Sequence, residues 1–358
     1  MKVLVFRFGS LGDTVLALPA LSWIRSHYGA QSEITLLENR SFNAEVAIRH
    51  LLENTPYIDH FLAYPTGNRS WSFYRELLLL SQKIRREKFD VVISLAPGQR
   101  FGRVAHWRDS LFFLFCLIWH QVGFFPFPRR IIYPRDANGR PAVVPSEACF
   151  LFERLTSSGF ATGRSLADPL SPPDIKLTEE ESKQADAWLA AHRRHPDRPL
   201  VIMAPGAKQP VNRWPPDRYA ALGSLLLEKK ICEILIVGGK NEISLQERLL
   251  NTWQDGLGAS GMFSPRITAA IMARSQLFIG PDSGPVHLAS AVGVPCVAIF
   301  SDRDNPGRWH PLGKGHHVIR KAVHCGGCCF STCPRSDHLC MTSISTSEVL
   351  DVVLKTLS

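Results

Sequence analysis

Two hydrophobic patterns alternate along the chain: short apolar runs, and longer segments whose apolar positions recur at helical spacing. Residues 2–8 form an apolar run with one Arg, and a glycine turn and helix-spaced apolar positions follow it. We therefore predict a strand, a glycine turn and a helix at the start of the chain. Further buried strands are predicted at residues 34–37 and 91–95, with a basic helical segment around 77–88.

The same alternation restarts after a proline-rich stretch at residues 166–173, which we interpret as a domain linker. The later strands are predicted at residues 200–204, 234–237, 277–279 and 296–300, and the later helices at 215–230, from about 242, from 285 and at 347–357. This order predicts an α/β protein with two doubly wound, Rossmann-like parallel sheets. We assign residues 1–170 to the first domain, 171–341 to the second, and 342–358 to a helix that packs back on the first. Ligands of such sheets bind beyond the carboxyl ends of the strands.

The composition is that of a globular protein, with 45% hydrophobic and 20% charged residues in a chain of 358. Its length suits two hydrophobic cores. The formal charge of +9 fits a polyanionic partner, such as a phosphorylated glycolipid or an anionic membrane, and equally fits a solvated basic face. No known nucleic-acid-binding motif interrupts the sheets, so we expect no nucleic-acid partner.

The chain starts with an apolar run too short for a signal peptide, and its longest apolar stretch, residues 111–119, is too short to span a bilayer. We therefore expect a cytoplasmic protein. The aromatic stretch at residues 111–127 is either core or a face that leans on a membrane, because basic residues flank it on both sides. These residues are Arg103, Arg108, Arg129 and Arg130.

Residues 279–289 (I-G-P-D-S-G-P-V-H-L-A) combine a strand end, a glycine loop and a helix start. Backbone N–H groups of Ser283 and Gly284, aided by the helix dipole, are suited to bind a diphosphate. The alternative is that Asp282 and Ser283 only cap the helix and that His287 is a core histidine.

Three more loops follow predicted strands. Residues 204–215 contain Lys208 and Arg213, cations suited to phosphate oxygens, although a basic surface turn is the alternative. Glu242 follows the next strand and is suited to accept hydrogen bonds from ribose hydroxyls. Asp13 lies in the first turn, which lacks the full dinucleotide fingerprint; it is suited to accept a proton, or else it caps the helix.

Five of the nine cysteines gather near the C-terminus, at Cys325, Cys328, Cys329, Cys333 and Cys340. The first pair has zinc-like spacing, but a second C-x-x-C is missing. Cys325, Cys328, Cys333 and Cys340 are candidates for a structural zinc site, with His324 and His338 nearby in sequence. Reduced buried thiols are the alternative, and the one that we favour.

Taken in order, three motifs resemble glycosyltransferase family 9, which contains the ADP-heptose:lipopolysaccharide heptosyltransferases. They are F-G-S-L-G-D-T-V-L-A-L-P-A-L at the start, A-P-G-A with N-R-W-P in the middle, and F-I-G-P-D-S-G-P-V-H-L-A-S-A-V-G-V-P later. The resemblance implies a GT-B fold and an inverting, metal-independent transfer of heptose from ADP-heptose to the lipopolysaccharide inner core. A nucleotide-sugar donor and a lipid-linked or phosphorylated glycan acceptor are then the partners, with peripheral contact at the inner membrane.

Carried over by position, the resemblance makes Asp13 the general base and Glu242 the ribose contact. It assigns the donor diphosphate and sugar to a loop formed by Asp282, Ser283, Gly284 and His287. Similar enzymes usually have Lys at the position of Asn212, so phosphate binding falls here to Arg213 or Lys208.

Alternative readings are another hexosyltransferase or an epimerase on the same fold, or a protein that binds a nucleotide-sugar without turnover. Asp302-Arg303-Asp304 is formally a metal-binding D-x-D motif, but its place after the last predicted strand favours a solvated loop.

Overall fold

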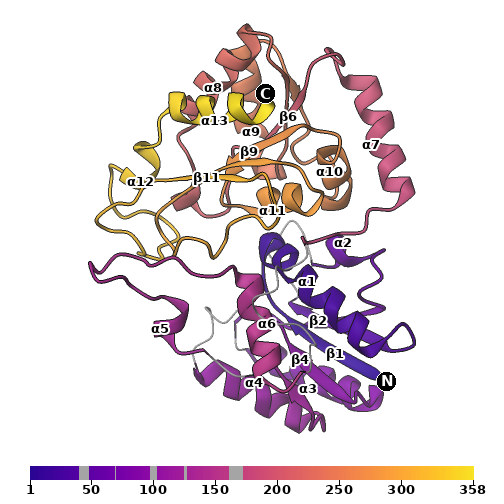
Figure 1. Ribbon diagram of the computed structural model, residues 1–358. Helices are drawn as coiled ribbons and strands as arrows, with labels where there is room; N and C mark the ends of the chain where they lie inside the picture. The colour runs from indigo at the N-terminus through magenta and orange to yellow at the C-terminus, as the bar shows by residue number, and fades with distance from the viewer. Residues whose placement is uncertain (40–47, 69, 97–102, 125–126, 161–171) are drawn as a thin grey trace. The chain divides into compact units, whose positions relative to one another are not determined.

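The computed structural model describes residues 1–39, 48–68, 70–96, 103–124, 127–160 and 172–358. The chain divides into two compact units (Figure 1). The first unit consists of Met1–Ile132 and Glu147–Ser171, and the second of Tyr133–Ser146 and Pro172–Ser358.

The first unit contains a five-stranded parallel sheet in the order β3-β2-β1-β4-β5. Its strands are β1 (Lys2–Arg7), β2 (Glu33–Asn39), β3 (His60–Tyr64), β4 (Val91–Ser94) and β5 (Gln121–Val122). The helices are α1 (Leu11–Tyr28), α2 (Arg49–Leu52), α3 (Trp71–Glu87), α4 (Arg103–Phe115), α5 (Arg129–Ile132) and α6 (Glu147–Ser157). The strand order reverses direction between β1 and β4, so the loop after β1 lies at the switch point of the sheet.

The second unit contains a six-stranded parallel sheet in the order β11-β10-β9-β6-β7-β8. Its strands are β6 (Leu200–Met203), β7 (Glu233–Ile236), β8 (Leu257–Gly258), β9 (Leu277–Pro281), β10 (Cys296–Phe300) and β11 (His317–Arg320). The α-helices are α7 (Glu179–His192), α8 (Pro216–Glu228), α9 (Ile243–Trp253), α10 (Pro265–Met272), α11 (Gly284–Ala291), α12 (Leu339–Thr342) and α13 (Thr346–Leu357). Two short 3-10 helices, η1 (Pro210–Asn212) and η2 (Lys240–Glu242), follow β6 and β7. Here the order reverses between β6 and β9.

The predicted fold class is confirmed, because both units are α/β with wholly parallel, doubly wound sheets. Four strands were not predicted, namely β3, β5, β8 and β11. Two of them, β5 and β8, have only two residues each and carry no periodic signal. The proposed linker at 166–173 lies largely outside the described residues.

The segment 133–146 was assigned to the first domain, but it belongs to the second unit. Its Val144 N–H donates to the Pro306 carbonyl at 2.9 Å. The side-chain amide of Asn305 donates to the carbonyls of Pro134 and Ala142 at 2.8 and 2.9 Å. These bonds join residues more than 160 positions apart, so they leave no local pattern in the sequence.

The last helix, α13, has its described core contacts in the second unit. Val349 and Val353 lie in the same apolar core as Trp214. The indole N–H of Trp214 donates to the Ile344 carbonyl, just before α13, at 3.0 Å. The sequence led us instead to expect packing on the first domain.

Among the described residues, no helix combines the length and apolar character needed to cross a bilayer.

Candidate donor site and candidate base

The loops that follow β6, β7, β9 and β10 meet at the carboxyl edge of the second sheet. Because neighbouring parallel strands end at the same edge, residues far apart in sequence are brought together there. The sequence-predicted donor residues Lys208, Arg213, Glu242 and Asp282 all lie on these loops.

Asn212 links three of these loops. Its side-chain amide donates to the backbone carbonyl of Asp282 at 2.9 Å and to the Asp282 carboxylate at 3.2 Å. Its side-chain oxygen accepts a hydrogen bond from the Ser301 hydroxyl at 2.7 Å. Asn212 is buried, and these bonds satisfy its amide group on both sides. In the sequence, Asn212 was notable only because similar enzymes usually have Lys at this position.

Asp282, Ser283, Gly284 and His287 form the turn from β9 into α11. Ser283 is the N-cap residue of α11, but its side chain makes no capping hydrogen bond to the helix. His287 is buried, and its Nε2 lies 4.0 Å from Oδ1 of Asp282. The backbone at this helix start carries the positive end of the helix dipole, which favours an anion.

Glu242 is held against two glycines. Its Oε2 accepts the Gly239 N–H at 2.7 Å. A β-carbon at Gly206 would lie 1.7 Å from Glu242 Oε1, and one at Gly238 would lie 2.3 Å from Oε2. Glycine at both positions therefore makes room for the carboxylate, which joins the loop after β6 to the loop after β7. The two glycine-containing loops could be recognised in the sequence, but their contact through Glu242 could not.

Lys208 and Arg213 are the exposed cations of the loop after β6. Arg213 Nε donates to the Ala207 carbonyl at 2.8 Å, which orients the guanidinium. Within the described residues, no hydrogen bond joins Arg213 or Lys208 to Asp282 or Glu242. The structure thus brings Asp282 close to Asn212 and His287, while the two cations stand at the surface of the same edge.

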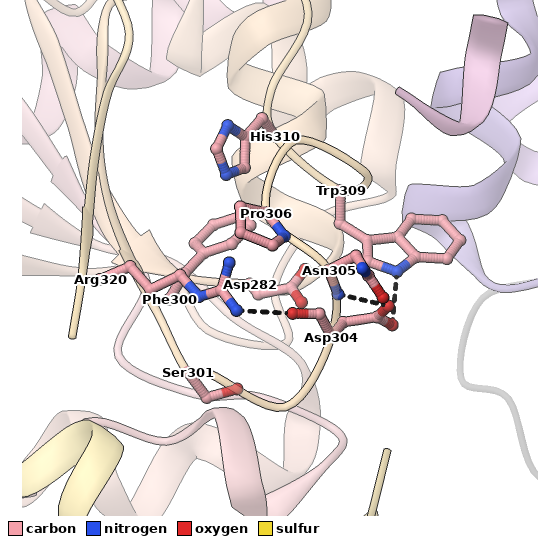
Figure 2. Close-up of a pocket in the computed structure, with 9 residues that line it drawn as sticks. All are labelled: Asp282, Phe300, Ser301, Asp304, Asn305, Pro306, Trp309, His310 and Arg320. Carbon is pink, nitrogen blue, oxygen red and sulfur yellow. Dashed lines mark hydrogen bonds between the residues drawn. The ribbon is translucent and has the colours of Figure 1, made fainter. Parts of the chain in front are cut away.

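A small pocket beside Asp282 is lined by residues from the ends of β9, β10 and β11 and from the loop after β10 (Figure 2). The lining residues are Asp282, Phe300, Ser301, Asp304, Asn305, Pro306, Trp309, His310 and Arg320. Burial, and secondarily the charge of Arg320, lowers the pKa of His310, so its neutral form is favoured.

The D-x-D carboxylates are not in the solvated loop that we expected. Asp302 is buried, forms an ion pair with Arg320 and accepts the Val323 N–H at 2.9 Å. Asp304 is also buried, and its carboxylate accepts the Trp309 indole N–H at 2.9 Å. Both side chains therefore hold the loop around the pocket in place.

The candidate base, Asp13, lies in the first turn of α1 and is buried. Its Oδ2 accepts the backbone N–H and the hydroxyl of Ser10, at 2.5 and 2.7 Å. Oδ1 accepts no hydrogen bond from any described residue. The buried guanidinium of Arg7 donates to the Asp13 carbonyl. Asp13 therefore caps the helix through one oxygen, and the geometry leaves the other available for a second role.

Among the described residues, the arrangement of the cysteine cluster does not confirm the zinc site that the spacing suggested. Cys340 is buried, which raises the pKa of its thiol, with smaller contributions from Cys333 and Cys325. All nine thiols are free. In the described part of the chain, no group of three or more His, Cys, Asp or Glu side chains is arranged to hold a metal ion. The zinc prediction is therefore not confirmed.

Solved structures share this fold over nearly the full chain. The Escherichia coli ADP-heptose lipopolysaccharide heptosyltransferase II matches with a TM-score of 0.71 at 20% identity, covering 100% of this chain and 98% of that one. A family 9 glycosyltransferase from Veillonella parvula matches with a TM-score of 0.73 at 20% identity, covering 99% and 97%. Together, the two α/β units and these matches define a GT-B protein.

The family follows from the sequence. Residues 77–338 match the model of glycosyltransferase family 9 (heptosyltransferase), which is more than half of the chain. The lipopolysaccharide heptosyltransferase 2 of Escherichia coli is 23% identical over 329 residues, covering 89% of this chain and 88% of that protein. The chain belongs to glycosyltransferase family 9, and the protein is a glycosyltransferase.

Proposed function

We propose that the protein transfers a heptose, or a related sugar, from an ADP-heptose-type donor to the lipopolysaccharide inner core or a related surface glycan. Donor binding by the second unit is supported by one observation. Four loops converge at one edge of its sheet, and Asn212 and Glu242 join them to one another. The identity of the sugar is proposed from the relatives, because the matched proteins include lipopolysaccharide heptosyltransferases.

In this proposal the donor binds along the carboxyl edge of the second sheet. The start of α11 and the cations Arg213 and Lys208 hold the diphosphate. Glu242 accepts hydrogen bonds from the ribose hydroxyls, and Asp282 with His287 contacts the sugar. We propose that the neighbouring pocket, which Trp309 helps to line, forms one wall of the sugar site.

Asp13 acts as the general base on the acceptor. As the acceptor oxygen attacks the anomeric carbon, its proton passes to Asp13 Oδ1, and the bond from that carbon to the diphosphate oxygen breaks. The leaving nucleotide diphosphate keeps the electron pair and is stabilised by the helix start and the two cations. A single displacement of this kind inverts the anomeric configuration. We propose that catalysis is metal-independent, with the helix start and the two cations compensating the charge of the leaving diphosphate.

We further propose that the reaction takes place on the cytoplasmic side of the inner membrane, where a lipid-linked acceptor is presented. This accounts for the basic charge of the chain.

The test is a donor screen by isothermal titration calorimetry, followed by product analysis with a lipopolysaccharide acceptor that lacks heptose. We expect ADP-heptose to bind more tightly than UDP-hexoses and to yield an acceptor that carries one more heptose. Tight binding and transfer of another nucleotide-sugar would contradict the assigned sugar. Release of an epimer without transfer would indicate an epimerase, and binding without turnover a regulatory protein.

A further inference from the structure

Helices α3 and α4 cover one face of the first sheet. The connections β3 to β4 and β4 to β5 cross the sheet in the same direction, so right-handed crossovers place both helices on the same side. They also touch, since Arg85 Nε donates to the Phe115 carbonyl at 2.8 Å and its guanidinium lies 4.2 Å from the Phe115 ring centroid. Figure 1 shows the two helices adjacent in the first unit.

The inner sides of both helices are ordinary core. Leu80 and Ile84 of α3 and Phe113 of α4 belong to one apolar cluster. The aromatic stretch of the sequence is therefore core in part, which was one of the two alternatives predicted from the sequence.

The outer sides carry large apolar residues that face solvent. On α4, Trp107, Leu111 and Phe115 are spaced four residues apart and form a stripe, with exposures of 68%, 61% and 53%. On α3, Trp71 and Leu78 lie two turns apart on one side, with exposures of 79% and 51%. Tyr74, Leu79, Leu117 and Trp119 extend the surface. We call these nine residues the α3–α4 face.

This concentration is not a scatter of single residues. Within the described residues, the α3–α4 face holds nine of the sixteen large hydrophobic side chains that are exposed. Isolated exposed apolar residues are normal, whereas a contiguous group marks an interaction surface. Aromatic side chains dominate it, as in surfaces that rest at a membrane interface.

Exposed cations lie beside the apolar residues on the α3 side of the face. Arg75, Lys83, Arg85, Arg86 and Lys88 all lie on α3 or at its C-cap. The acids of the helix are Glu76 and Glu87, and Glu87 is already paired with Lys2 at 3.1 Å. The face is therefore both apolar and cationic. Two copies meeting through this face would bring like charges together, which disfavours a symmetric dimer.

We propose that the α3–α4 face binds the surface of an anionic lipid bilayer. The aromatic and leucine side chains enter the interface between headgroups and acyl chains, and the Arg and Lys side chains contact lipid phosphates. This inference rests on the proposed function for its biological setting, because it gives the membrane contact a definite surface. Its test uses neither donor nor acceptor.

The experiment is flotation of the full-length protein with vesicles of phosphatidylglycerol and phosphatidylethanolamine, against vesicles of phosphatidylcholine alone. We expect binding to the anionic vesicles, weakened by salt, with a blue shift of tryptophan fluorescence and quenching by brominated lipid. Leu111→Glu should lower the partition coefficient by about tenfold or more, the factor for one large apolar side chain. Arg86→Glu should lower it by about fivefold or more.

Matched controls come from exposed positions of the second unit. Val143→Glu and Lys183→Glu should bind vesicles like the wild type, because both residues are exposed outside the α3–α4 face. Circular dichroism checks the fold of each variant. If Leu111→Glu does not fold, Trp107→Gln and Trp71→Gln replace it, with the same direction of effect.

The proposal would be overturned if the protein bound phosphatidylcholine vesicles as well as anionic ones. It would also be overturned if the folded face variants bound like the wild type, or if the control variants lost as much binding as the face variants. So would a dimer in ultracentrifugation that Leu111→Glu dissociates while vesicles go unbound. If the protein binds vesicles but transfers no heptose, this inference stands and the proposed function is wrong. If it transfers heptose but does not bind vesicles, the proposed function stands and this inference is wrong.

Discussion

The turn after β1 and the loops of the second sheet hold their acidic side chains in different ways. Asp13 in the first unit is held by Ser10, three residues earlier. Asp282 in the second unit is held by Asn212, which is 70 residues away and is itself held by Ser301. The candidate base therefore depends on one local turn, whereas the candidate donor site depends on several strands being in place.

This difference predicts how the two regions respond to substitution. A change at Asp13 should act on chemistry and leave the fold alone. A change at the centre of the second region should act on binding and stability together, because the same hydrogen bonds serve both.

The largest effect is expected for Asp13→Asn. The amide keeps the shape and an oxygen that accepts hydrogen bonds from Ser10, but it cannot take up the acceptor's proton, so turnover should fall by about 10²- to 10⁴-fold. Initial rates at saturating donor measure this, while calorimetry with ADP and thermal melting should change little.

Ser10→Ala is the matched control for this variant. It removes the hydroxyl that donates to Asp13 Oδ2 and leaves the carboxylate with the Ser10 N–H, so it should cost about 1 kcal/mol of stability and retain most turnover. If Asp13→Asn retains turnover and instead lowers the melting temperature, Asp13 is only a cap, and the base is another residue.

Arg213→Ala should weaken ADP binding by about 1.5 to 3 kcal/mol, the value for a lost charged hydrogen bond. Its Nε donates to the Ala207 carbonyl. In the described part of the chain, its other two guanidinium nitrogens have no partner, so they are available to phosphate oxygens. Calorimetry with ADP measures the loss, and Lys229→Ala, an exposed cation at the end of α8, is the control. An unchanged dissociation constant in Arg213→Ala, together with a loss in Lys208→Ala, would move the phosphate contact to Lys208.

Asn212→Ala should lower the free energy of unfolding by about 1 to 3 kcal/mol, because the partly buried Asp282 and the buried Ser301 each lose hydrogen bonds to Asn212. ADP-heptose should also bind more weakly, since Asp282 is no longer held. Chemical denaturation and calorimetry measure the two effects, with the exposed Asn251→Ala as control. Loss of stability without loss of affinity would show that Asn212 supports the fold and not the site.

The same distinction explains what the sequence could predict. The strand, turn and helix that place Asp13 follow from a local apolar run, glycines and helical spacing, and so does the turn into α11. The role of Asn212 could not be predicted, because its hydrogen-bond partners Asp282 and Ser301 lie 70 and 89 residues away and leave no local pattern in the sequence. The placement of segment 133–146 also depends on distant bonds, those of Asn305. Of the α3–α4 face, the sequence indicated only the part within residues 111–127, and that as two alternatives, since an apolar stretch does not reveal which of its sides is covered. The α3 part of the face was not predicted.

The smallest effect is expected from removal of divalent metal, which should leave turnover unchanged. The formal D-x-D motif is the natural place for a catalytic metal, but its carboxylates already have structural partners. Asp302 pairs with Arg320, and Asp304 accepts from the Trp309 indole, so a metal would have to break bonds that shape the pocket. Initial rates before and after EDTA treatment provide the measurement, with metal content of the protein determined in parallel. A complete loss of turnover that Mg²⁺ or Mn²⁺ restores would contradict the proposal, provided that any metal held by the Cys325 to Cys340 segment stays in place. Under that condition the comparison of the two regions would also change, because the second would then require an ion as well as its own hydrogen bonds.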